Sequence, residues 1–114
     1  MFKKKKITVY LQNLQEKERT AFDLLLTDYL EGSLKSQLQT LGIQKIDIHI
    51  DWLDDFKCIG VQGKYQNYYL NLQIYPDEFT ISFDVDEADD GHTHSLNDKN
   101  QVYRILSDTM KHLK

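Results

Sequence analysis

The spacing of the apolar residues changes near residue 43, and this change constrains the fold more than any other feature. Across residues 22–41 apolar side chains recur every three or four positions, which is typical of an amphipathic helix. From residue 43 they alternate with polar side chains, as in residues 46–51, which is typical of strands with one buried face. The pattern predicts helices first and an antiparallel sheet after them.

The helical half contains start, break and stop signals. Asn13 with Glu16, or Thr20 with Asp23, can form a capping pair at a helix start. An unbroken helix over residues 14–41 would span roughly 42 Å at about 1.5 Å per residue, much longer than a strand of ordinary length. We therefore expect a break near Gly32. Residues 7–11 fit either a short strand or a helical lead-in, and we favour the lead-in.

Four alternating segments follow, over residues 43–51, 56–62, 69–75 and 79–86. Short connectors join them, which predicts a meander in which sequential strands are neighbours. In the second segment the apolar residues fall out of phase, and a bulge near Gly60 would reconcile them. Ser95, followed three residues later by Asp98, predicts the start of a final helix with one apolar stripe.

The fold class is therefore α+β. We expect a four-stranded antiparallel meander, with an N-terminal helix broken near Gly32 and a C-terminal helix packed on one face. The 114 residues, 40% hydrophobic and 28% charged, fit a single domain over residues 1–114. Four consecutive lysines follow Met1 and Phe2, and we expect residues 1–6 to form a flexible basic arm.

Charge and cysteine content narrow the class of partner and the compartment. Residues 1–45 carry 8 Lys/Arg against 5 Asp/Glu, whereas residues 46–114 carry 6 against 13, which gives balances of +3 and −7. Such an acidic C-terminal part repels nucleic acid and anionic membranes, so we expect neither as a partner.

No apolar run suits a signal peptide or a membrane span, and the one cysteine excludes an internal disulfide. We expect a cytoplasmic protein.

The acidic segment after the fourth strand is the candidate metal site. Asp84 and Asp86 lie two residues apart, and His92 and His94 follow, so carboxylates and imidazoles could together bind a divalent cation. The spacing around Gly91 does not match a calcium loop, and no phosphate-binding loop accompanies the carboxylates. A metal-dependent enzyme or metal sensor is thus an alternative function. The leading interpretation includes no cofactor and no catalytic residue.

The outer face of the sheet is the leading candidate site. Tyrosine and amide side chains suit protein contacts, and carboxylates there favour a basic partner. We expect a small non-catalytic binding or regulatory module, of inhibitor or immunity type, that binds a basic protein. The alternatives are a homodimer that buries this face, and ordinary cross-strand pairs on a wet sheet. The expected contact residues are Tyr69, Asn71, Gln73, Tyr75, Asp84 and Asp86.

Overall fold

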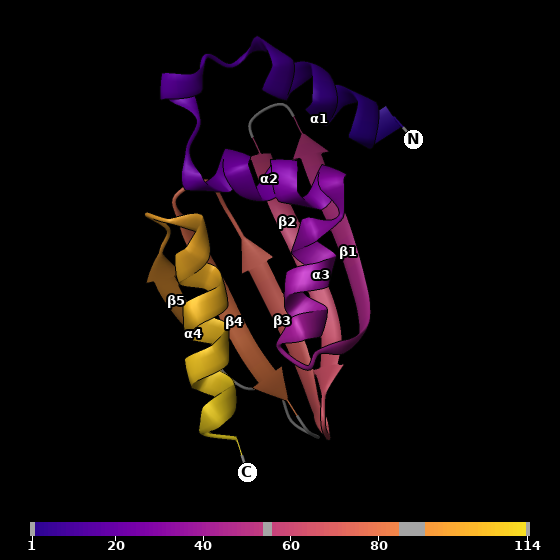
Figure 1. Ribbon diagram of the computed structural model, residues 1–114, viewed down its shortest axis with the longest axis vertical. Coiled ribbons are helices and arrows are strands. Elements are labelled where there is room, and N and C mark those ends of the chain that lie inside the picture. The colour runs from indigo at the N-terminus through magenta and orange to yellow at the C-terminus, as the bar shows by residue number, and fades with distance from the viewer. Residues whose placement is uncertain (1, 54–55, 85–90, 114) are drawn as a thin grey trace.

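A computed structural model describes residues 2–53, 56–84 and 91–113, with residues 2–5, 53, 56 and 84 described by their backbone alone. Helices come first, strands follow, and one helix ends the chain (Figure 1). The elements are α1 (Phe2–Asn13), a 3₁₀ turn (Glu16–Glu18), α2 (Ala21–Glu31), α3 (Ser33–Thr40), β1 (Gln44–Leu53), β2 (Phe56–Tyr65), β3 (Tyr68–Ile74), β4 (Glu78–Asp84), β5 (His92–Ser95) and α4 (Lys99–Lys111).

The five strands form one antiparallel sheet in the order β1-β2-β3-β4-β5. Figure 1 shows α2, α3 and α4 on the same side of this sheet, with α1 beyond the end where β1 and β2 meet. The core lies between the layers and includes Leu25, Leu72, Phe79 and Leu106, all fully buried or nearly so. The predicted α+β class and the meander are confirmed, although the sheet has five strands where four were expected.

The break predicted near Gly32 is present. Gly32 has a φ of 85° and separates α2 from α3, a left-handed conformation that a residue without Cβ adopts at little cost. Of the two predicted helix starts, Thr20 with Asp23 is the real one. The Thr20 hydroxyl accepts the Asp23 backbone N–H while the Asp23 carboxylate accepts the Thr20 N–H. Residues 16–18 form only a 3₁₀ turn.

Helix α1 occupies the segment expected to be a flexible arm and a helical lead-in. It begins at Phe2, so the lead-in is confirmed while residues 2–6 belong to the helix instead of preceding it. Ile7 is fully buried and Leu11 nearly so, four residues apart on one helix face. The Tyr10 ring meets the Trp52 ring edge-on at 4.9 Å, and the Lys57 Nζ donates to the Tyr10 hydroxyl at 3.1 Å. These contacts hold α1 against the β1–β2 hairpin.

A fifth strand, β5, lies within the acidic segment, where no strand was predicted from the sequence. Residues 92–95 pair with β4, with His92 opposite Ile81 and His94 opposite Phe79. The His94 ring stacks on the Phe79 ring, with 5.3 Å between the ring centres. The sequence of β5 shows no apolar alternation, so this strand could not be predicted and forms because it pairs with β4. The final helix starts three residues later than predicted, because Asp98 is its N-cap and accepts the Asn100 N–H.

The bulge predicted near Gly60 is not there, and this prediction is wrong. Residues 56–62 pair regularly with β1, and the irregularity lies further along, where β1 residues 45–46 fall between paired positions. Lys45 has a φ of 53° at that point. The apparent phase conflict has another cause: Ile59 faces the core, while Cys58 is buried on the opposite side of the sheet.

Candidate functional site

The side of the sheet opposite to the helices, here called the open face, carries the predicted contact residues of β3. Tyr69 is 56% exposed, and Asn71 and Gln73 are also exposed. Their side chains alternate with the fully or almost fully buried Leu70 and Leu72, so strand geometry alone directs them away from the core. The structure therefore brings three of the six predicted residues together on one accessible surface.

The other three predicted residues are less available for contact or lie outside the described side chains. Tyr75 is half-buried, and its hydroxyl already has partners within the protein: it donates to Gln73 Oε1 at 3.0 Å and forms a hydrogen bond with Cys58. Asp84 pairs with Tyr69 across β3 and β4, a register position on the open face, although its side chain is outside the described residues. Asp86 lies entirely outside the described residues. The accessible part of the predicted set is thus centred on β3.

Charges on the open face are mostly negative among the described side chains. Asp47 and Glu78 are exposed and Asp51 is half-buried, each at a strand position that alternates with the core-facing residues. The only described ammonium group of β2 on this face is that of Lys64, which lies 5.6 Å from the centre of the Tyr69 ring. That cation–π contact stabilises the ring from one side. The arrangement suits a partner with positive charge.

The sheet does not bring the described candidate metal ligands to one side. His92 and His94 are opposite Ile81 and Phe79 and therefore share the helix-covered side, whereas position 84 has the register of the open face. His92 also lines a cleft of about 310 Å³ between β4 and α4, and His112, which follows the last residue of α4, is another of its lining residues. Within residues 2–53, 56–84 and 91–113, no three histidine, cysteine or carboxylate side chains are grouped to hold a metal ion.

Cys58 is a buried thiol on the open-face side of β2, and its surroundings suppress its reactivity. Burial raises the pKa of the Cys58 thiol, and the nearby Asp51 carboxylate raises it further. The thiolate, which is the nucleophilic form, is therefore disfavoured. Burial likewise raises the pKa of Tyr75, with Cys58 as the next cause. This pair packs the sheet and offers no activated nucleophile.

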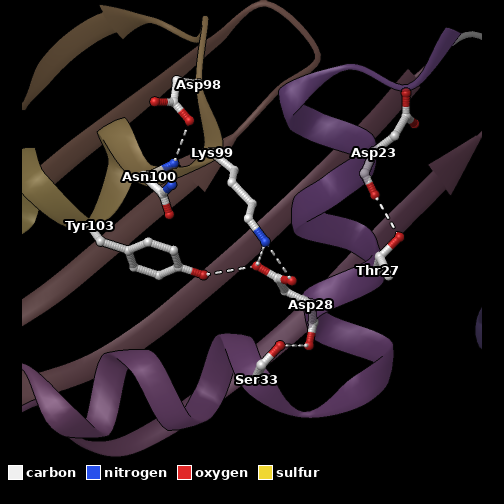
Figure 2. A network of polar contacts seen from close by, with 8 residues as sticks. All are labelled: Asp23, Thr27, Asp28, Ser33, Asp98, Lys99, Asn100 and Tyr103. Carbon is white, nitrogen blue, oxygen red and sulfur yellow. Dashed lines mark hydrogen bonds and ion pairs between the residues drawn. The ribbon is translucent and has the colours of Figure 1, made fainter. Parts of the chain in front are cut away.

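A second polar cluster, here called the polar clasp, joins α2 to α4 through Asp28, Lys99 and Tyr103 (Figure 2). The Lys99 Nζ donates to both carboxylate oxygens of Asp28, at 3.1 and 3.2 Å, and the Tyr103 hydroxyl points to the same carboxylate from 3.5 Å. Burial, followed by the Asp28 charge, raises the pKa of Tyr103. Since the ammonium and carboxylate satisfy each other, the clasp fixes the position of α4.

The polar clasp was not predicted from the sequence, although one signal for it was present. Asp28 follows Leu25 by three residues and so lies on the buried side of its helix, where a carboxylate needs a partner. Its partners are more than 70 residues further along the chain. That pairing depends on how the helices pack and cannot be inferred from local spacing.

Comparisons with protein-family models, with curated proteins and with solved structures gave no match for this chain. None of the helices in the described part of the chain is both long enough and apolar enough to cross a membrane. Function is therefore inferred from the geometry and charge of the surfaces described above.

Proposed function

We propose that this protein is a small non-catalytic binding module that recognises a basic protein through the open face of its sheet. The observation that carries this proposal is the composition of that face. Exposed Tyr69, Asn71 and Gln73 form its centre, and the described carboxylates of the face lie on β1, at Asp47 and Asp51, and on β4, at Glu78. Tyrosine and amide side chains make adaptable contacts, and carboxylates select a partner of opposite charge.

The arrangement of layers supports a role in binding. Helices α2, α3 and α4 cover one side of the sheet (Figure 1). The polar side chains of β3 on the other side, Tyr69, Asn71 and Gln73, are exposed. An inhibitor or immunity-type protein needs such a rigid surface, since binding then costs little ordering of the free protein. The single buried cysteine is compatible with the reducing cytoplasm in which we place this activity.

Affinity capture from the source cells tests the proposal with a matched pair of variants. The face variant carries Tyr69→Ala, Asn71→Ala and Gln73→Ala. The control variant carries three alanines at exposed positions of α3, namely Ser36, Gln37 and Gln39. We expect wild type and control to retain one basic protein that high salt releases, and the face variant to lose it. Equal capture by the face variant, or no specific partner, would reject the proposal.

Native mass and metal titration separate the alternatives in the same preparation. A dimer that the face variant converts to a monomer would show that a second copy covers the open face. Capture that requires a divalent cation would favour a metal sensor. The proposed module remains monomeric by itself and binds its partner equally well with a chelator present.

A further inference from the structure

The two edges of the sheet differ sharply in how well they are protected. Edge strands expose unpaired backbone groups, and proteins commonly limit this by making edge strands short or by placing lysine, proline or a bulge in them. β5 is only four residues long, whereas β1 has ten residues. In β1 the bulge at residues 45–46 affects only the first part of the strand, and the rest pairs regularly with β2.

The regular part of β1 has one partner strand. Residues 47–53 pair with β2, and among the described residues no other segment forms a backbone hydrogen bond with positions 46–50. Half of the peptide groups there point along the sheet toward an absent neighbour, as the edge position of β1 requires (Figure 1). A ten-residue strand has room for an extended partner segment of ordinary strand length.

Side chains on the two sides of β1 specify what such a segment would contain. On the helix side, Ile46 and Ile48 are half-buried and pack against the core, so they leave apolar surface at the edge. On the open face, Asp47 is exposed and Asp51 follows four residues later. An added strand would cover the isoleucines with alternate aliphatic side chains and place its intervening residues beside the carboxylates.

Two symmetric registers that would pair β1 with a second copy of this chain are unfavourable. Antiparallel self-pairing centred on His49 would set Asp47 opposite the second copy's Asp51, and like charges directly opposite are destabilising. Centring the pair on Ile48 would instead bring Lys45 opposite the second copy's Asp51. Lys45, however, has a φ of 53° within the bulge and is not in a regular strand conformation. Charge complementarity therefore favours a basic segment from another protein.

We propose that the edge of β1 binds an extended segment of the basic partner as a sixth strand, with lysine or arginine alternating with aliphatic residues. This proposal rests on the proposed function and specifies the form of its partner. Backbone hydrogen bonds supply part of the affinity, and the alternating pattern supplies selectivity. Asp47 and Asp51 select the charge, while Ile46 and Ile48 select the apolar positions.

Titration with a short synthetic peptide of alternating valine and lysine tests the edge. Trp52, the single tryptophan, lies in β1 and is half-buried, so its fluorescence reports on the strand. The control peptide has the same side chains and charges but is N-methylated along its backbone, which removes the donors that pair strands. Amide hydrogen exchange then identifies which residues become protected.

We expect the unmethylated peptide to change Trp52 emission and to protect amides of β1, and the methylated peptide to do neither. Asp47→Lys weakens binding about ten-fold, because an opposite-charge pair becomes a like-charge pair. Asp108→Lys on α4, the control with the same charge change, leaves binding within about two-fold because it is remote from β1.

Equal binding of the two peptides would mean charge attraction alone and would overturn the proposal. Protection confined to β3, no binding, or a native dimer that the peptide does not dissociate would also overturn it. These outcomes are distinguishable from failure of the proposed function. If capture still depends on Tyr69, Asn71 and Gln73, the open face remains the binding surface and only the edge is rejected.

Discussion

Removing the cation of the polar clasp should destabilise the fold more than removing any exposed lysine. In Lys99→Met the aliphatic stem stays and the ammonium is lost. The Asp28 carboxylate, whose side chain is only 11% exposed, then keeps just the Tyr103 hydroxyl at 3.5 Å. An orphaned buried charge costs about 3–5 kcal/mol. Because the Lys99 side chain is 33% exposed and water reaches the pair, we expect about 2–3 kcal/mol.

Urea denaturation measures this loss through the midpoint at constant slope. A loss of about 2–3 kcal/mol should also lower the thermal midpoint by about 8–12 °C in a chain of this size. Lys111→Met is the matched control. Its Nζ is 3.8 Å from Asp108 and both side chains are more than 70% exposed, so we expect a change below about 0.5 kcal/mol.

The double variant Lys99→Met with Asp28→Asn identifies the cause. If the orphaned carboxylate accounts for the loss, replacing it with a neutral amide should recover more than half of the stability. Equal decreases in the free energy of unfolding for Lys99→Met and Lys111→Met would refute the conclusion that the polar clasp holds α4 in position. Strictly additive losses in the double variant would refute it as well.

Three further outcomes test the packing of the sheet and of α4. Gly63→Ala should cost about 1–3 kcal/mol, because the added Cβ would lie 2.6 Å from the Ile43 Cγ2. Gly60→Ala should cost less, since the His49 ring that it meets is exposed and can turn away; equal losses in urea denaturation would contradict this. Native Cys58 should react with iodoacetamide only as fast as the domain opens, and a rate independent of stability would contradict its burial. Because the folded state raises the pKa of Tyr103 above its ordinary value of 10.0, the unfolded chain releases that proton first, and stability should fall as pH rises above about 10. Tyr103→Phe should flatten this decline, and an unchanged alkaline slope would refute the assignment.

The sequence was sufficient where local chemistry determines local structure. The change of period at residue 43 and the break at Gly32 depend on near neighbours, and both were predicted. The cap of Thr20 and Asp23 is also local and was one of the two predicted helix starts.

The features that the sequence did not predict depend on distant partners. Strand β5 contains two histidines and no apolar alternation, so its conformation follows from pairing with β4. Helix α1 begins among lysines that give no hydrophobic signal, and burial of Ile7 anchors it. Of the candidate site, the β3 side chains followed from alternation alone. The contrast between the two edges of the sheet was not predictable, because the four-residue strand β5 that forms the edge opposite to β1 was not predicted.

Photo-crosslinking from the open face tests the central claim most directly. A photoreactive residue at Asn71, exposed in the middle of β3, is compared with one at Gln37, exposed on α3. We expect the Asn71 probe to form one discrete adduct with a basic protein in the source cells, and the Gln37 probe to form none. The same adduct from both positions, or an adduct from Gln37 alone, would contradict recognition through the open face.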